Sequence, residues 1–238
     1  MKKKRLIYLI TLLLCVLLYC YSDNLHNNDI AQNDTHYSRS DKALEGIPEY
    51  SGSPFAIVNG NVPSFDEDEL IPDCFEDYSP LDRLGRCTVA TACIGKQTMP
   101  REERQSISHV YPTGWEQEAY SFVDGGYLYN RCHLIGYQLT GENDTEENLI
   151  TGTRYLNTEG MLPFENMVAD YIKETGNHVM YRVTPVFEGS NLLASGVIME
   201  ARSIEDNGEG IMFNVYCYNV QPGVEIDYAD GFSTIKKR

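Results

Sequence analysis

The sequence predicts an α+β fold in which a central antiparallel β-sheet packs against one long helix. Three β-rich runs, at residues 178–187, 192–203 and 211–220, are separated by turn residues, which is typical of antiparallel hairpins or a meander. One clear amphipathic helix precedes them. With 238 residues, 42% of them hydrophobic and 23% charged, the chain has the composition of a globular protein with one sizeable core.

The N-terminus has the pattern of an export signal. Residues 1–5, four of which are basic, lead into an almost uninterrupted apolar run at residues 6–19. No clear cleavage site follows, so a cleaved signal, a single-span anchor and a lipidated Cys20 remain open, and the bulky Tyr19 makes lipidation the third choice. We assign residues 1–22 to a signal peptide or an N-terminal anchor that would contact the membrane. Each alternative places the rest of the chain outside the cytoplasm of a bacterium.

A flexible polar spacer is expected at residues 23–46, because this stretch has almost no apolar periodicity. The folded domain then spans residues 47–238. Its first half predicts an extended segment at 54–58, a strand at 86–94, a short helix at 98–107 that carries Arg101 and Arg104, and a turn at 112–115.

The middle of the domain predicts two short strands before the long helix. Residues 127–138 follow two glycines and are rich in aromatic and apolar side chains, and residues 148–155 follow an acidic loop at 142–147. The helix begins near Pro163 and ends at Gly176. Apolar side chains recur at helical spacing, at Phe164, Met167, Val168, Tyr171 and Ile172. We therefore expect this face of the helix to pack on a core.

The charge and the cysteines limit the function classes. A formal net charge of −16 argues against a broad basic surface that binds nucleic acid. Weak, transient binding of nucleic acid through a local arginine cluster and a divalent cation is still compatible with this charge. Five of the seven cysteines lie in the exported part, and no pair has C-x-x-C spacing, so we expect no structural metal. Their odd number leaves at least one thiol free or paired between chains.

The segment Asn130-Arg131-Cys132-His133 could serve phosphodiester hydrolysis, which needs a base and positive charge. Residues i and i+2 of an extended segment share a face. Arg131 and His133 could therefore point at one phosphate, with His133 activating water. Cys132 would face the other side, which argues against a thiol nucleophile. Alone, this pattern is more often surface polarity or a satisfied core histidine.

The spacing of later residues strengthens the functional interpretation. Asn157 follows Asn148 by nine positions (157 − 148), and Glu165 lies eight further on, on the predicted helix. Here the chain resembles the DNA/RNA nonspecific endonuclease family, the ββα-metal or His-Me finger nucleases, in particular nucleases of bacterial DNA uptake and secreted streptodornase-like DNases. The resemblance runs from about residue 50 to 232 and includes the segments Leu84-Gly85-Arg86, Pro112-Thr113-Gly114-Trp115, His133-Leu134-Ile135-Gly136-Tyr137 and Phe213-Asn214-Val215.

The resemblance implies a ββα-metal motif and a role for each residue. His133 would be the general base, and Asn157 the single direct protein ligand of Mg²⁺, for which Mn²⁺ is a possible substitute. Glu165 would hold a metal-bound water, and Asn148 would position His133 or the scissile phosphate. Arg131 would stabilise the transition state, giving products with 5′ phosphates. Asn130 and either Arg101 or Arg104 would bind substrate, although the two arginines could equally form a solvated helix face.

Simpler interpretations stand beside these roles. Asn157 could be a helix cap or turn residue, Glu165 an ordinary first-turn acid, and Asn148 a loop residue. Two positions depart from the family motif Asp-Arg-Gly-His, because Asn130 replaces Asp and Cys132 replaces Gly. Cys132 adds a side chain that could lower activity.

The function that the resemblance implies is therefore an exported, Mg²⁺-dependent, sequence-nonspecific endonuclease. It would act as a monomer on the phosphate backbone of DNA, with RNA as a further candidate substrate. Two alternatives remain open. One is a catalytically weakened surface protein that binds nucleic acid, and the other is a secreted nuclease toxin.

Overall fold

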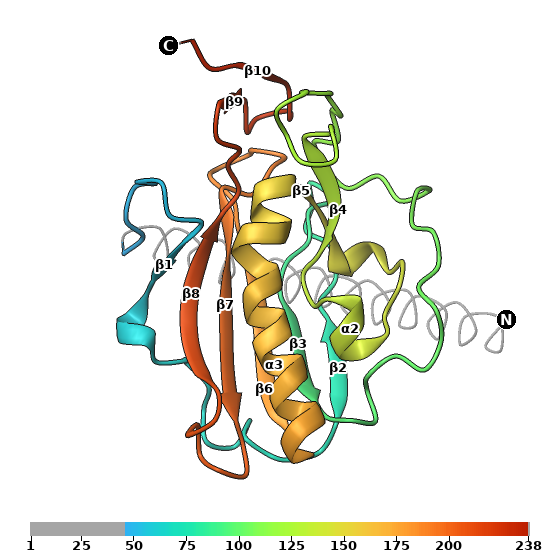
Figure 1. Cartoon of the computed structure of the whole chain (residues 1–238), viewed down its shortest axis with the longest axis vertical. Helices are drawn as coiled ribbons and strands as arrows, with labels where there is room; N and C mark the ends of the chain where they lie inside the picture. Colours follow the sequence, from blue (N-terminus) through green and yellow to red (C-terminus); the bar gives the residue numbers. More distant parts are fainter. Residues whose placement is uncertain (1–45, 238) are drawn as a thin grey trace, which may run out of the picture. The chain divides into compact units, whose positions relative to one another are not determined.

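The computed structural model describes residues 46–237. The predicted signal or anchor at 1–22, and the predicted spacer up to residue 45, lie outside the described residues. The predicted α+β fold with a central antiparallel sheet is confirmed (Figure 1). Six strands form the sheet in the order β1-β8-β7-β6-β3-β2, all antiparallel: β1 (Phe55–Ile57), β2 (Phe75–Tyr78), β3 (Ala90–Ile94), β6 (Val179–Val186), β7 (Gly196–Ser203) and β8 (Met212–Tyr218).

The three C-terminal strands form the predicted meander. β6 pairs with β7 from Val186↔Gly196 to Val179↔Ser203, and β7 pairs with β8. The turn between β7 and β8 contains Asn207 and Gly208, both with positive φ, which these two residue types tolerate better than others. The sequence therefore specifies this turn locally.

Helix α3 (Leu162–Thr175) lies across one face of the sheet (Figure 1). Pro163 occupies the first turn as expected, and Gly176 ends the helix in a left-handed conformation with its N–H bonded to Ile172 O. Phe164, Val168 and Ile172 are buried in the main core, whereas Met167, predicted on the same face, is largely exposed. A π-helical turn, η3 (Leu156–Met161), precedes α3.

A second group of elements packs beside the start of α3 and the turn before it. Strands β4 (Tyr129–His133) and β5 (Leu149–Thr153) form a two-stranded hairpin, in which Cys132 pairs with Ile150. The connection between them contains α2 (Tyr137–Thr140) and the short helix η2 (Glu146–Asn148). Outside this unit lie η1 (Asn59–Asn61), β9 (Val224–Ile226) and β10 (Ser233–Ile235), the last two paired with each other.

Two predictions about the first half of the domain were wrong. Residues 98–107 form an extended loop instead of a short helix. The Thr98 hydroxyl donates to Leu139 O, and Gln105 N–H donates to the side chain of Asn143, so distant partners replace helical hydrogen bonds. The strand expected at 86–94 begins only at Ala90, because Arg86 is held in a turn by an ion pair with Asp82.

Within residues 46–237, no helix is long and apolar enough to cross a membrane. All five cysteines of this part of the chain carry free thiols, and four of them, Cys87, Cys93, Cys132 and Cys217, are buried.

Candidate active site

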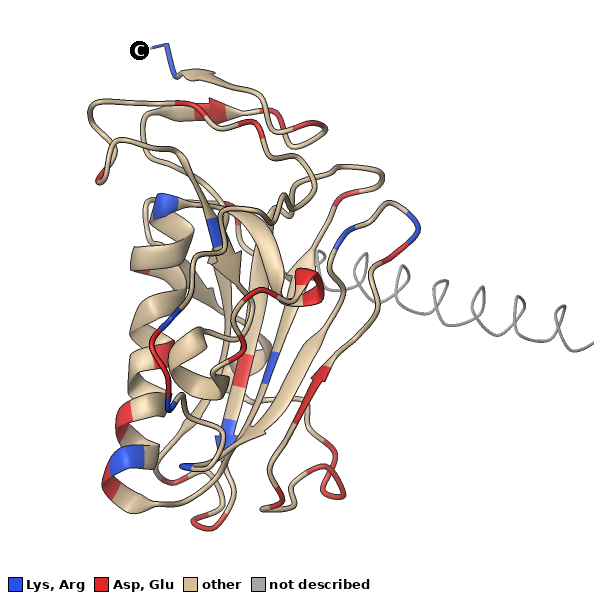
Figure 2. Cartoon of the chain, turned by 90° about the vertical axis from the view of Figure 1, so that its right-hand side faces the viewer, with Lys and Arg blue, Asp and Glu red and all other residues tan. Residues whose placement is uncertain are grey.

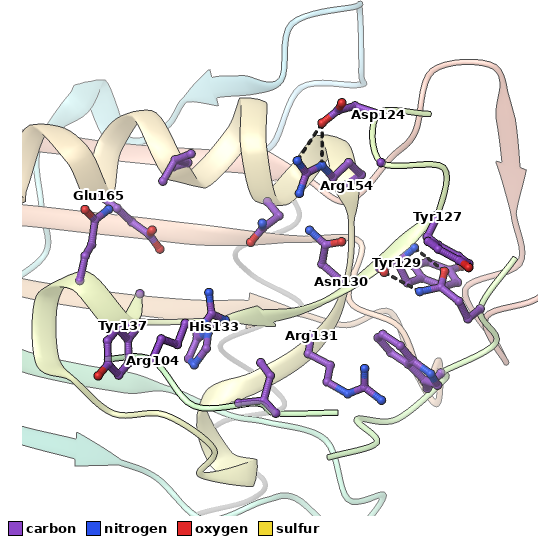
Figure 3. Close-up of a pocket in the computed structure, with 18 residues that line it drawn as sticks. Arg104, Asp124, Tyr127, Tyr129, Asn130, Arg131, His133, Tyr137, Arg154 and Glu165 are labelled. Atoms are coloured by element: carbon purple, nitrogen blue, oxygen red, sulfur yellow. Dashed lines mark hydrogen bonds and ion pairs between the residues drawn. The ribbon is translucent and has the colours of Figure 1, made fainter. Parts of the chain in front are cut away.

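A cleft with a volume of about 640 Å³ runs along β4 and the start of α3 (Figure 3). Six residues singled out by the sequence line it: Arg104, Asn130, Arg131, His133, Asn157 and Glu165. Asn148 and Arg101 do not line it. β4 contributes the Asn130–His133 segment, and the extended loop before it brings Arg104 to the imidazole.

His133 is held as a neutral imidazole with a defined proton position. Its Nε2 lies 2.9 Å from Asn143 O, and a carbonyl can only accept, so Nε2 carries the proton. Nδ1 therefore keeps its lone pair, and accepts a hydrogen bond from Arg104 Nη2 at 3.3 Å. The pKa of His133 is lowered to about 4, mainly by burial and also by the positive charge of Arg104. The unprotonated Nδ1 is thus available as a base at neutral pH.

Asn148 is fully buried beneath the turn that follows His133. Its Oδ1 accepts from Ile135 N–H at 2.9 Å, and its Nδ2 donates to Ile135 O at 3.1 Å. The Asn148 carbonyl also accepts from Leu134 N–H. Of the two roles expected for Asn148, direct contact with a phosphate is not supported, because the side chain lies outside the cleft. Asn148 instead fixes the backbone on which His133 sits.

Asn157 belongs to the π-helical turn η3, and is neither a helix cap nor a loop residue. Its Oδ1 lies 3.2 Å from the Cys132 thiol, which is buried on the opposite side of β4 from the solvent and also contacts Met161. Gly152 on β5 makes room for this side chain, because a Cβ there would lie 2.6 Å from Cys132 Cβ. Burial raises the pKa of the Cys132 thiol well above its usual range, so it stays protonated.

Glu165 points from the first turn of α3 into the cleft and is mostly buried (Figure 3). Burial raises the pKa of Glu165 to about 7, against the opposing influence of Gln138, Arg104 and Gly136. Its carboxylate packs directly on Gly136, where a Cβ would lie 2.5 Å from Oε2. A glycine is needed at position 136 for this close approach.

The arginines of the cleft differ in how many partners hold their guanidinium groups. The Arg131 guanidinium donates to the carbonyl oxygens of Val110 and Ser108, and lies 4.2 Å from the ring centre of Trp115. Arg104 has the imidazole as its polar partner. The structure therefore distinguishes Arg104 from Arg101, which is exposed outside the cleft.

Charge in the cleft contrasts with the rest of the protein. Asp and Glu residues are spread over many loops of the surface, while Lys and Arg are few (Figure 2). In the cleft, three arginines, Arg104, Arg131 and Arg154, face two acids, Asp124 and Glu165. The cleft therefore carries a local excess of arginines over acids in an otherwise acidic protein.

Sequence reasoning missed the end of the cleft away from Glu165. Tyr127, Arg154 and Asp124 line it, together with Trp115 and Gln117. Gln117 bonds both backbone groups of Tyr129, which fixes the start of β4. These residues come from separate segments and share no local motif, so only their spatial arrangement identifies them.

Comparisons with known proteins find a matching nuclease family model and nucleases of similar fold. A family model described as DNA/RNA non-specific endonuclease matches residues 62–205. The structure of NucA from Streptococcus agalactiae with a magnesium ion bound is similar, with a TM-score of 0.71 and 23% sequence identity over 84% of this chain and 95% of that one. The Sda1 nuclease with a bound zinc ion gives a TM-score of 0.65 and 26% identity over 77% and 97%. A structure described as an extracellular endonuclease gives 0.55 and 21% over 79% and 100%.

Proposed function

Because the chain belongs to the DNA/RNA non-specific endonuclease family, we propose that it is an exported, Mg²⁺-dependent nuclease with His133 as its general base. The observation that carries this proposal is the imidazole of His133, whose proton is fixed on Nε2 by Asn143 O and whose Nδ1 faces a cleft lined with arginines. The substrate is the phosphate backbone of DNA, with RNA as a second candidate, because phosphate contacts carry no base sequence.

In the proposed reaction, His133 Nδ1 takes a proton from water as the water oxygen attacks phosphorus. The bond between phosphorus and the 3′ oxygen then breaks, and the 3′ oxygen takes a proton from a second water, leaving a 5′ phosphate and a 3′ hydroxyl. An imidazole with a pKa of about 4 is a weak base, and the adjacent Arg104 contributes to that weakness. A substrate phosphate that draws Arg104 away from Nδ1 would raise the basicity of His133 when substrate is present.

Two arginines supply positive charge for the phosphorane. Arg104 is the more adjustable, because its guanidinium is bonded to the imidazole and can exchange that partner for a phosphate oxygen. Arg131 is oriented by two backbone carbonyls and two aromatic rings, so it offers a fixed edge to the substrate. Asn130 lies on the same strand and lines the cleft, where its amide can bond a phosphate oxygen.

The residues present fit a magnesium ion. Mg²⁺ prefers oxygen ligands and keeps several waters, and the cleft places the amide of Asn157 together with the buried carboxyl of Glu165. Asn157 Oδ1 would bind the ion directly, and Glu165 would hold one of its waters. When bound, the ion would neutralise charge on the departing 3′ oxygen.

Export is proposed from residues 1–22 and from relatives whose structures are described as an extracellular endonuclease and an extracellular nuclease. The folded domain at residues 47–238 would then act outside the cell, either released or held at the outer face of the membrane. We also propose that it acts as a monomer, with the whole site built from one chain.

A plasmid-nicking assay of the full-length protein with Mg²⁺ and with EDTA tests the proposal. Wild type should nick only with the metal, and His133→Ala and Asn157→Ala should lose the activity. His178→Gln is the matched control, because His178 follows the C-terminal end of α3 and bonds Glu205. Wild-type nicking by His133→Ala, or nicking in EDTA, would refute the proposed chemistry.

One observation favours a second candidate function. The Cys132 thiol contacts the oxygen that would bind the metal, so the site could be catalytically weakened and the protein could serve to bind nucleic acid. In that case wild type binds DNA without nicking it, and Cys132→Gly restores nicking.

A further inference from the structure

We propose that the end of the cleft at Tyr127 and Arg154 binds the nucleotide next to the scissile phosphate, and that Asp124 competes with that nucleotide for Arg154. The inference rests on the proposed function and deepens it. It names a second phosphate position, a base-stacking position and an internal competitor, none of which belongs to the His133 site.

The two positions are parts of one continuous cleft. Tyr127, Asn130, Arg154 and His133 all line it, and Figure 3 shows Asn130 between the Arg154 side chain and Arg131. Arg154 follows β5 directly, and its N–H donates to Leu128 O at 2.7 Å. This bond fixes the base of the arginine beside Tyr127. A strand of nucleic acid with one phosphate near His133 can therefore reach Arg154 along the same surface.

Arg154 is held by an acid that a phosphate can replace. Its Nη2 and Nε both donate to Asp124 Oδ2, at 2.7 and 3.1 Å. The Asp124 side chain is 80% exposed and that of Arg154 is 34% exposed. An ion pair this exposed contributes little free energy, because water screens it. A phosphodiester offers two nonbridging oxygens to the same guanidinium fork, which makes it an effective competitor.

The turn that carries Asp124 can release it. Gly125 and Gly126 follow it with φ of 75° and 79°, and a Cβ at either position would meet no atom within 4 Å. The carboxylate thus projects from an uncrowded loop, and no packing has to be broken when it leaves Arg154.

Tyr127 provides an available aromatic face. Its side chain is 59% exposed, and among the described residues it forms no aromatic pair and has no arginine over its ring. Of the other rings at this end, Tyr129 is buried and Trp115 already has Arg131 over it. Stacking on a tyrosine tolerates any base but requires an unstacked one, so this subsite selects single-stranded or locally opened nucleic acid.

The test measures binding and turnover separately. A fluorescein-labelled single-stranded octanucleotide is titrated, by anisotropy with Mg²⁺ present, into full-length His133→Ala protein and into further variants in that background. Arg154→Gln should weaken binding about tenfold, and should reduce the slope of log affinity against log salt by about 0.7. Tyr127→Ala should weaken it about tenfold, whereas Tyr127→Phe keeps the ring and should not.

Competition by Asp124 predicts a specific pattern of octanucleotide affinities. Asp124→Asn should strengthen binding about two- to fivefold, and should have no effect once Arg154→Gln is present. Asp170→Asn on α3 is the control for net charge and should leave binding unchanged, since Asp170 lies outside the cleft. A gain from Asp124→Asn that persists without Arg154 would show general charge repulsion and overturn the competition.

Bis-p-nitrophenyl phosphate separates this inference from the proposed function, because so small a diester occupies only the His133 site. With His133 intact, the Arg154→Gln and Tyr127→Ala variants should hydrolyse it at the wild-type rate and show a raised KM for the octanucleotide. If the octanucleotide is bound and cut equally well by these variants, the subsite is wrong and the nuclease stands. If wild type neither binds nor cuts either substrate, both proposals fail.

Discussion

Replacing Asn148 by alanine should destabilise the protein and slow catalysis without removing any group from the cleft. The side chain is fully buried and makes two hydrogen bonds with Ile135, to N–H at 2.9 Å and to C=O at 3.1 Å. Alanine leaves both backbone groups buried and unpaired, at about 1–3 kcal/mol each, so the free energy of unfolding should fall by about 2–6 kcal/mol. The turn after His133 then loses its support, and a displacement of about 1 Å at the base lowers kcat roughly 100-fold.

Asn214→Ala is the matched control, because Asn214 is also buried and its Nδ2 donates two hydrogen bonds, to Val62 O and Glu200 Oε1. It lies on β8, outside the cleft. Urea unfolding should show a loss of stability for both variants, while nicking at a temperature where both are folded should fall only for Asn148→Ala. An unfolding free energy within about 0.5 kcal/mol of wild type for Asn148→Ala would refute the reasoning, as would an unchanged kcat.

Three further predictions concern the groups around the base. His133 should titrate at about 4 by NMR of its ring protons in the metal-free protein, against 6.5 for an unburied histidine. As pH falls, the unfolded state takes up this proton before the folded state does. The free energy of unfolding that the neutral His133 contributes is therefore lost as pH falls from 6.5 towards 4. A titration near 6.5 would contradict the burial. Cys132→Gly should free Asn157 Oδ1 and raise the Mg²⁺ affinity a few-fold, as measured by calorimetry. The free energy of unfolding should fall by about 1–3 kcal/mol. An unchanged affinity would mean that the thiol does not compete with Mg²⁺ for the Asn157 oxygen. Gly136→Ala should lower activity with an unchanged circular dichroism spectrum, because φ of −60° suits alanine while the added methyl group displaces Glu165. Gly46→Ala is the control and should be neutral, because a Cβ there meets open space. A fully active Gly136→Ala variant would count against the role of Glu165.

Elements with a strong local pattern could be predicted from the sequence. α3 has apolar residues at helical spacing, Pro163 in its first turn and Gly176 at its end, so its bounds follow from local chemistry. The β6–β8 meander follows from alternating β-rich runs and glycine-containing turns. Both are fixed by residues close together in the chain.

The loop at 98–107 could not be predicted, because its conformation depends on partners far away in the sequence. Its Arg-Glu-Glu-Arg run has good helix formers, yet Thr98 bonds Leu139 O and Gln105 bonds Asn143. The same loop decides which arginine reaches His133, so the choice of Arg104 over Arg101 also required the three-dimensional structure.

The candidate site was predictable to the extent that its residues share one motif. His133, Asn157 and Glu165 were found by their spacing, and the cleft brings them together. The role of Asn148 was not determined by spacing, since a buried clamp and a phosphate contact give the same pattern. Arg154 and Asp124 lie 30 positions apart and have no pattern at all.

The π-helical turn η3 has a geometric consequence for the two residues proposed to serve the metal. In a regular α-helix each residue advances about 100°, so side chains eight positions apart would diverge by about 80°. A turn closed by i→i+5 bonds, such as that from Leu162 N–H to Asn157 O, winds more slowly, at roughly 80° per residue. The slower winding over η3 cancels most of the divergence, and Asn157 and Glu165 come to face the same cleft. The π turn thus accommodates one extra residue, because at a spacing of seven ordinary α-helical winding would already bring the two side chains to within about 20° of each other.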